Sequence, residues 1–230
     1  MEHGFSWVGT VPGLAAIPPH VATAFLVMIG LAIFALRVRA RLAATPDPTI
    51  PDPGFSARNT AEVVTEMIGS LAEGVLGHDY PKYVPLFASL FLFILVANLV
   101  GLLPGFTPPT DNFNITLALG AVSFGAYNYY GFRAHGLAYL KQFMGPLVLL
   151  APLMIVVEGF SHLFRPASLA IRLYGNMFAD HLLLGIFTDL TKVVIPVVFY
   201  VLGTFVSLVQ ALVFTLLTMV YVGLAISHDH

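Results

Sequence analysis

One charged residue lies where its surroundings make a charge costly. Arg172 falls within a long, mostly apolar stretch that runs from Phe143 to about Phe187. An arginine side chain does not lose its proton in a protein, and a charge inside a bilayer costs from about 3 to more than 10 kcal/mol unless water or a counter-charge relieves it. We therefore expect water or a negatively charged group beside Arg172. An ionisable residue at this depth indicates a functional site.

Polar residues precede and follow this arginine at helical spacing. At about 100° per residue, Glu158, Arg165 and Arg172 form one stripe, and Asn176 lies about 40° from Arg172. The alternative to a functional role is that Arg172 is a structural cation paired with Glu158 or Asp180. For Arg165 we favour a structural role, in which its long side chain reaches the membrane surface.

A second set of polar groups faces other directions. Asp180 lies about 80° from the arginine on the helix and His181 about 180° away. Ser207 and Gln210 put a hydroxyl and an amide on the last apolar segment, and an amide can hold a guanidinium or a carboxyl. Singly, such groups are more often hydrogen bonds between helices. Haem ligation by His162 and His181 is disfavoured, because both histidines lie on one helix.

The composition shows what surrounds these residues. Apolar residues make up 58% of the 230 and charged residues only 10%, and the mean hydropathy is +0.88, whereas about a quarter of a soluble domain is charged. The chain is therefore predicted to be an integral membrane protein. The net charge of −2 and the scattered basic residues argue against nucleic acid as a partner. The absence of cysteine excludes disulfides and thiolate metal sites.

The elements that position the polar groups are predicted to be helices. We expect an all-α membrane protein with about five transmembrane crossings, one interfacial amphipathic helix, and two long tilted helices at the end. Both last segments exceed the roughly 20 residues of a perpendicular crossing, so they must tilt or kink. A single membrane domain then covers 1–230: an outer lead-in at 1–19, a first span at 20–40, the interfacial helix at 59–77, a helical hairpin at 83–133, and the tilted pair at 143–227.

Two of these segments carry further expectations. The segment 59–77 is too polar to span, so it lies along the membrane interface or forms an ordinary cytoplasmic helix. Both readings fit its pattern equally. In the hairpin, Asn98 and Asn114 flank a Pro- and Thr-rich loop. We expect them to cap helix ends or to bond the backbone there, and a role in ion access is the less favoured alternative.

The basic residues predict the orientation in the membrane. Cytoplasmic loops of membrane proteins carry an excess of Lys and Arg. With the N-terminus outside, five crossings leave Lys192 as the basic residue of the outer loops and make the C-terminus cytoplasmic. The cytoplasmic side then holds Arg37, Arg39, Arg41, Arg58, Lys82, Arg133 and Lys141.

Three motifs carry a family resemblance. The chain reads NLVGLLPGFTPPT at 98–110, followed by NITLAL at 114–119, then PASLAIRLYGNMFA at 166–179 and QALVFTLLTMVY at 210–221. In this order they resemble the a subunit of the membrane sector of F-type ATP synthases. As a separate short chain with an N-terminal span, it looks like the bacterial form.

The resemblance implies a role in a rotary machine. In this family the a subunit is the stator that faces a rotating ring of c subunits, each with a carboxyl in mid-membrane, and two half-channels lead to that carboxyl. The implied partners are the c-subunit ring, the b subunits of the peripheral stalk, the remaining synthase subunits and the lipid bilayer, in the bacterial inner membrane. The subunit would have no catalytic site, cofactor or metal of its own, and would be a component of the proton-transporting ATP synthase.

The resemblance also assigns residues. By the match to the family, Arg172 is the essential arginine between the half-channels, and Gln210 and Asn176 flank it. Glu158, Asp180 and His181 become proton-relay candidates on the half-channel nearer the outside. The remaining pathway candidates are Ser207 and His162.

The chain departs from the family pattern at two positions. The family usually has a small residue at the position of Asp180, and often a histidine or carboxylate at that of Gly203, which has no side chain. We therefore expect Asp180 to do the work of the missing group from the adjacent helix. His181 fits, because the family carries Glu or His there.

Other functions remain open at this point. A self-contained ion channel or secondary transporter would use Arg172 for an anionic substrate, and a redox subunit would hold haem or quinone. Protons are favoured over sodium as the coupling ion because the relay candidates are titratable.

Overall fold

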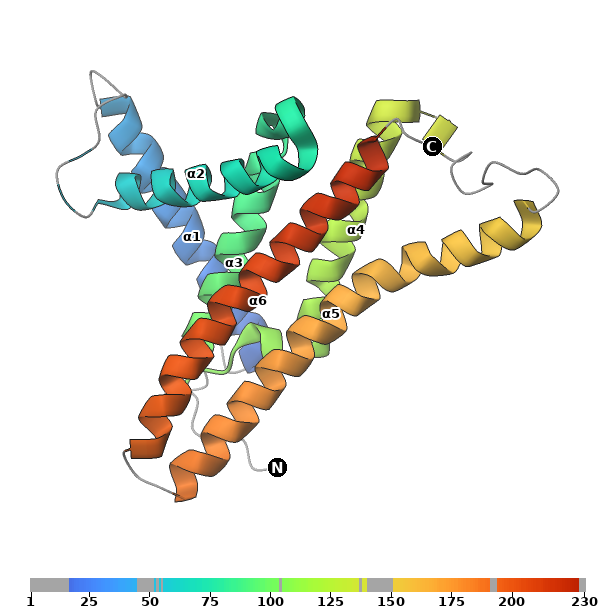
Figure 1. Ribbon diagram of the computed structural model, residues 1–230. Helices are drawn as coiled ribbons and strands as arrows, with labels where there is room; N and C mark the ends of the chain where they lie inside the picture. Colours follow the sequence, from blue (N-terminus) through green and yellow to red (C-terminus); the bar gives the residue numbers. More distant parts are fainter. Residues whose placement is uncertain are drawn as a thin grey trace.

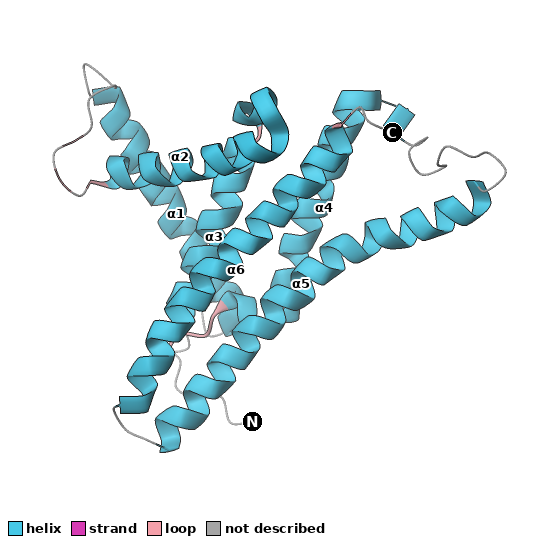
Figure 2. Cartoon of the chain, in the orientation of Figure 1, coloured by secondary structure: helices cyan, strands magenta, loops and turns pink. Residues whose placement is uncertain are grey.

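The computed structural model in Figure 1 describes residues 17–44, 52, 54, 56–103, 105–136, 138–139, 151–190 and 194–227. This part of the chain is helical and contains no strand, as Figure 2 also shows. Most of the expected lead-in at 1–19, most of the Pro-rich loop near residue 50, and residues 143–150 of the tilted pair lie outside the described residues. The helices are α1 (Pro19–Ala44), α2 (Ala57–Leu76), η2 (Gly77–Lys82), α3 (Val84–Gly101), η3 (Pro109–Asp111), α4 (Phe113–His135), α5 (Ala151–Leu190) and α6 (Val194–Ile226).

Three of the described helices are long and apolar enough to cross a membrane. They are α1, α3 and the part of α6 from Pro196 to Ile226. The prediction of an all-α protein is confirmed, whereas five crossings remain a prediction because α4 and α5 do not meet this criterion. In α5 the reason is its charges, which include Glu158, Arg165, Arg172 and Asp180.

Helix α2 lies across one end of the steeper helices (Figure 1). It begins after Ser56, whose side-chain oxygen accepts a hydrogen bond from the Asn59 backbone N–H at 3.1 Å, a common way to satisfy the first turn of a helix. Ile68 and Ala72 on its apolar face are fully buried in the core. The helix matches the segment expected at 59–77, and whether it lies in the membrane interface stays a prediction.

The turn between α3 and α4 is held by side chains. The Thr110 hydroxyl donates to Oδ1 of Asn98 over 2.7 Å, and both side chains are buried. Gly101 permits the turn, because a Cβ there would overlap Pro108. The expectation for the two asparagines was wrong: Asn98 bonds a side chain across the hairpin, and Asn112, not Asn114, caps α4.

Helices α4, α5 and α6 form the side of the bundle that carries the polar residues. Gly120 lets α4 approach α5 closely, since a Cβ there would lie 2.7 Å from the backbone oxygen of Pro166. The hydroxyls of Ser123 on α4 and Thr218 on α6 are hydrogen-bonded at 3.0 Å.

The C-terminal end of α5 lies beside the N-terminal end of α6, and the two helices diverge toward their other ends (Figure 1). Pro166 lies inside α5 without ending it, and a proline there removes one helical hydrogen bond, which favours a bend. The expectation of two long final helices is confirmed.

Candidate functional site

Arg172 lies on an exposed face of α5. Among the described residues its guanidinium makes no hydrogen bond or ion pair, so the alternative of a structural pair with Glu158 or Asp180 finds no support. Small residues surround it on the same exposed face: Ser168, Gly175 and Ala179. A Cβ added at Gly175 would meet nothing within 4 Å. This face therefore has room for a helix from another chain.

One helical turn further along α5, an amide pair links the two long helices. The side-chain amide of Asn176 donates to Oε1 of Gln210 on α6 over 2.7 Å. Gln210 is buried, and Asn176 is more exposed. The sequence predicted that both amides flank Arg172, and the structure brings them together one turn away from it.

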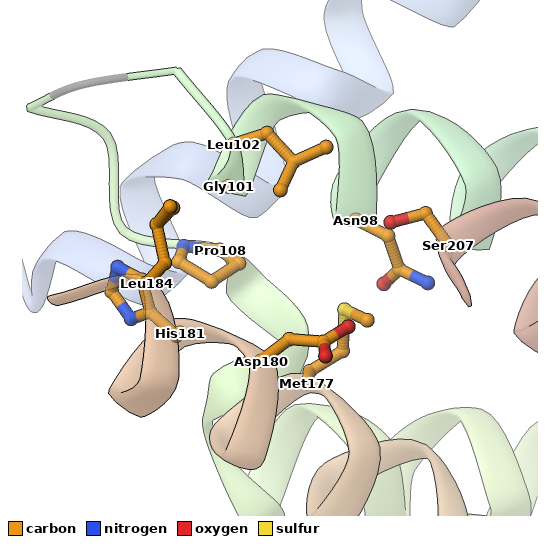
Figure 3. Close-up of a pocket in the computed structure, with 9 residues that line it drawn as sticks. All are labelled: Asn98, Gly101, Leu102, Pro108, Met177, Asp180, His181, Leu184 and Ser207. Carbon is orange, nitrogen blue, oxygen red and sulfur yellow. The ribbon is translucent and has the colours of Figure 1, made fainter. Parts of the chain in front are cut away.

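Asp180 lies at a small pocket between α3, α5 and α6. The pocket holds about 20 Å³, and Figure 3 shows Asp180 pointing across it toward Asn98 and Ser207. Three buried polar atoms here have no hydrogen-bond partner among the described residues: Asn98 Nδ2, Asp180 Oδ2 and Ser207 Oγ. A cavity needs about 10–15 Å³ and two to four polar neighbours to hold one water. The pocket therefore fits a single bridging water.

His181 lies on the other side of the same pocket and contacts the hairpin turn. Its Nδ1 is 3.2 Å from Oδ2 of Asp111 in η3. The second carboxyl oxygen of Asp111 is buried and has no partner among the described residues. The sequence analysis missed Asp111 as a partner of His181. The sequence did contain one indication: alternating membrane crossings place the hairpin turn and the C-terminal part of α5 on the same side of the membrane.

Glu158 lies near the opposite end of α5. It is 22 positions before Asp180, which is about 33 Å along a helix. Its carboxyl accepts a hydrogen bond from Arg165 Nη2 at 3.4 Å. The guanidinium of Arg165 lies 5.6 Å from the centre of the Tyr221 ring on α6. Arg165 is thus partly exposed and contacts two side chains of the chain itself, and its reach to the cytoplasmic surface stays a prediction. Glu158 and Asp180 therefore lie far apart along α5.

His162 is buried near Glu158 in a polar cluster between α4 and α5. Its Nε2 lies 2.9 Å from Oδ1 of Asn128, and the Tyr127 hydroxyl donates to its backbone oxygen over 3.1 Å. His162 and His181 are therefore far apart on one helix. Among the described residues, no group of three or more His, Asp and Glu side chains is placed to hold a metal ion.

Gly203 is buried on α6 and faces α3. A Cβ added there would lie 2.9 Å from Cδ2 of Leu102, so a leucine occupies the space that a larger residue at Gly203 would need. Thr204 next to it is exposed, and its hydroxyl donates to the Tyr200 backbone oxygen.

The sequence matches the family described as ATP synthase A chain over residues 20–223. The chain belongs to this family.

Relatives in the ATP synthase A chain family cover nearly the whole chain. A protein named ATP synthase subunit a, from Bdellovibrio bacteriovorus, is 46% identical over 98% of this chain and 99% of its own length. ATP synthase subunit a 1 of Syntrophotalea carbinolica is 41% identical over 92% of this chain and 87% of its own. ATP synthase subunit a of Geobacter sp. (strain M21) is 40% identical over 91% and 88%. The family resemblance of the three motifs is thereby confirmed.

Proposed function

We propose that this chain is the proton-conducting stator of an F-type ATP synthase membrane sector, with Arg172 facing the carboxyls of a c-subunit ring. The observation that carries the proposal is the exposed guanidinium of Arg172, which has no partner among the described residues and lies on a helix face of small residues. Membership of the ATP synthase A chain family supports it.

The charge of Arg172 explains how rotation and proton flow would be coupled. A protonated carboxyl can turn through lipid because it is neutral, whereas its ionised form is stable only beside a cation or water. Arg172 supplies that cation and makes the proton leave before the carboxylate passes. The arginine cannot carry the proton itself, because it stays protonated. A membrane potential supplies about 2.3 kcal/mol per charge per 100 mV.

The pocket at Asp180 would form the inner part of the half-channel from the outside. Asp180 would pass protons through a water held by Asn98 and Ser207, with His181 and Asp111 nearer the end of the bundle. Because Gly203 has no side chain and Leu102 fills the space beside it, the pocket's titratable groups come from α5: Asp180, which points toward Asn98 and Ser207, and His181 on the other side. This supports the expectation that Asp180 replaces the group missing at Gly203.

Glu158 would serve the other half-channel. Together with Arg165 and His162 it lies in the first half of α5, and it is about one membrane thickness from Asp180 along the helix. This revises the sequence-based assignment, which put Glu158 on the outer side. Asn176 and Gln210 lie between the two regions, where they would limit the approach of the ring carboxyl.

The orientation follows from the basic residues. Arg41 lies in the last turn of α1, Arg133 in the last turn of α4 and Lys82 in η2, which follows α2. The ends of α1, α4 and α6 and the whole of α2 lie at one end of the bundle (Figure 1). The positive-inside bias makes this end cytoplasmic and places the N-terminus outside. We propose the bacterial inner membrane as the location, and the c-ring, the b subunits and the remaining synthase subunits as partners.

Replacing Arg172 tests the proposal. In membranes carrying Arg172→Ala, we expect ATP synthesis driven by a proton gradient to be abolished and the membrane sector to leak protons. Arg172→Lys should also fail, since burial can neutralise a lysine. Arg39→Ala, which removes an exposed cation at the end of α1, is the control and should retain synthesis. Near-normal synthesis with Arg172→Ala would overturn the assignment, and purification without a c-ring would favour a transporter.

A further inference from the structure

A large open pocket lies at the end of the bundle far from Asp180. It has a volume of about 880 Å³, and its wall is formed by residues of α2, η2, α4 and α6 together with Tyr83, which directly precedes α3. None of the residues assigned above to the ion path lines it. Its chemistry therefore needs an explanation of its own.

The charges in this pocket favour a ligand with one negative charge. Lys82 Nζ donates to Oδ1 of Asp79 over 2.7 Å. This hydrogen bond lowers the pKa of Asp79 and raises that of Lys82, so the two charges persist and offset each other at neutral pH. Arg133 is exposed and makes no hydrogen bond or ion pair among the described residues, and its charge acts on Lys82. Among the described residues that line the pocket, Arg133 is therefore the one uncompensated cation.

The remaining wall has both aromatic and apolar surface. Tyr129 is 59% exposed and lies beside Tyr130, with ring centres 5.3 Å apart. Tyrosines of this kind are enriched at the level of lipid headgroups. Val75 is 39% exposed, and Ile226 is the last residue of α6. The wall thus combines hydroxyls and a guanidinium with surface that suits an acyl chain.

The position of the pocket agrees with headgroup depth. It lies where α3 begins, at Val84, and where α6 ends, and both helices are apolar enough to span a membrane. Helix α2 crosses the bundle at this end (Figure 1). Basic pockets between transmembrane helices at the cytoplasmic surface commonly hold acidic lipid headgroups.

We propose that this pocket binds one acidic phospholipid, with Arg133 holding the phosphodiester and the apolar wall holding the start of an acyl chain. A guanidinium can donate two parallel hydrogen bonds to phosphate oxygens. A phosphodiester carries a single negative charge, which matches the single uncompensated cation.

Photo-crosslinking of the complete synthase tests the proposal. The complex is reconstituted into vesicles of phosphatidylcholine with about one fifth phosphatidylglycerol, an anionic lipid. A trace of the phosphatidylglycerol carries a photoreactive group near the start of one acyl chain. Peptides that contain Val75 or Ile226 are then examined by mass spectrometry. We expect several times more labelling than with a matched phosphatidylcholine probe, and a drop of roughly fivefold in Arg133→Gln, the usual effect of removing one basic charge near a membrane surface.

Two further variants keep the result interpretable. Arg133→Lys keeps the charge and should retain most of the preference for the phosphatidylglycerol probe over the phosphatidylcholine probe. Arg39→Gln removes an exposed cation outside the pocket and should leave the labelling by both probes unchanged. Equal labelling by both probes, unchanged labelling in Arg133→Gln, or complete competition by millimolar inorganic phosphate would each overturn the proposal. Absence of labelling by either lipid, with crosslinks to another subunit instead, would show that a protein fills the pocket.

Discussion

Replacing Asp180 by asparagine removes a proton site from the pocket without changing its shape. The amide has nearly the size of the carboxyl, so the contacts with Asn98 and Ser207 and the space of about 20 Å³ should persist. A neutral amide cannot take up and release a proton at physiological pH. We therefore expect Asp180→Asn to leave assembly intact and to slow ATP-driven proton pumping. Asp180→Gly should act in the same direction.

The expected size of the effect follows from the geometry. The pocket has room for one water, so a continuous water chain cannot replace the carboxyl inside it. Positioned proton-transfer groups commonly contribute a factor of about 10² to 10⁴. We expect the low end, about 100-fold, because His181 and Asp111 lie beside the pocket and keep part of the route.

Inverted membrane vesicles give the measurement. The initial rate of ATP-driven quenching of a pH-sensitive dye is compared with wild type after normalisation to the amount of assembled complex. Ser207→Ala is the matched control, since it removes a hydrogen-bonding hydroxyl but no titratable group, and we expect a loss of about two- to threefold. A pumping rate for Asp180→Asn within a factor of two of wild type would refute the proposed relay.

Two other changes test parts of the same architecture. Asp111→Asn should weaken the contact with His181 at 3.2 Å and lower the pumping rate by about tenfold while ATP hydrolysis by the soluble part persists. An unchanged rate would remove Asp111 from the path. Gly120→Ala places a methyl group 2.7 Å from the Pro166 backbone oxygen and should destabilise the packing of α4 on α5 by about 1–3 kcal/mol. Thermal melting of the complex measures this, and equal melting for Gly120→Ala and Gly125→Ala, where nothing lies within 4 Å, would contradict it.

The helices were largely predictable because apolar stretches and charge breaks are local features. The segments expected at 20–40 and 59–77 correspond to α1 and α2, and α5 and α6 fill most of the expected pair at 143–227. The motif around Arg172 was also visible in the sequence. That Arg172 has no partner among the described residues could not be predicted, because a helical wheel gives the direction of a side chain but does not identify its neighbour.

Contacts between distant segments were the part that sequence reasoning missed. Asp111 and His181 are 70 positions apart, and Asn128 and His162 are 34 apart. No local periodicity encodes either pairing. The separation of Glu158 from Asp180, by contrast, was available from the helical rise alone and already favoured two different regions for these carboxyls.

A free copy of this chain would hold Arg172 against lipid tails. The energetic penalty of several kcal/mol would then fall on the unassembled subunit, which would have to thin the surrounding bilayer or draw water into it. In the proposed assembly, docking against an acidic rotor would remove that penalty. The side chain that we propose to couple rotation and proton flow would then also favour assembly of the complex, because the unassembled subunit would be less stable in the membrane.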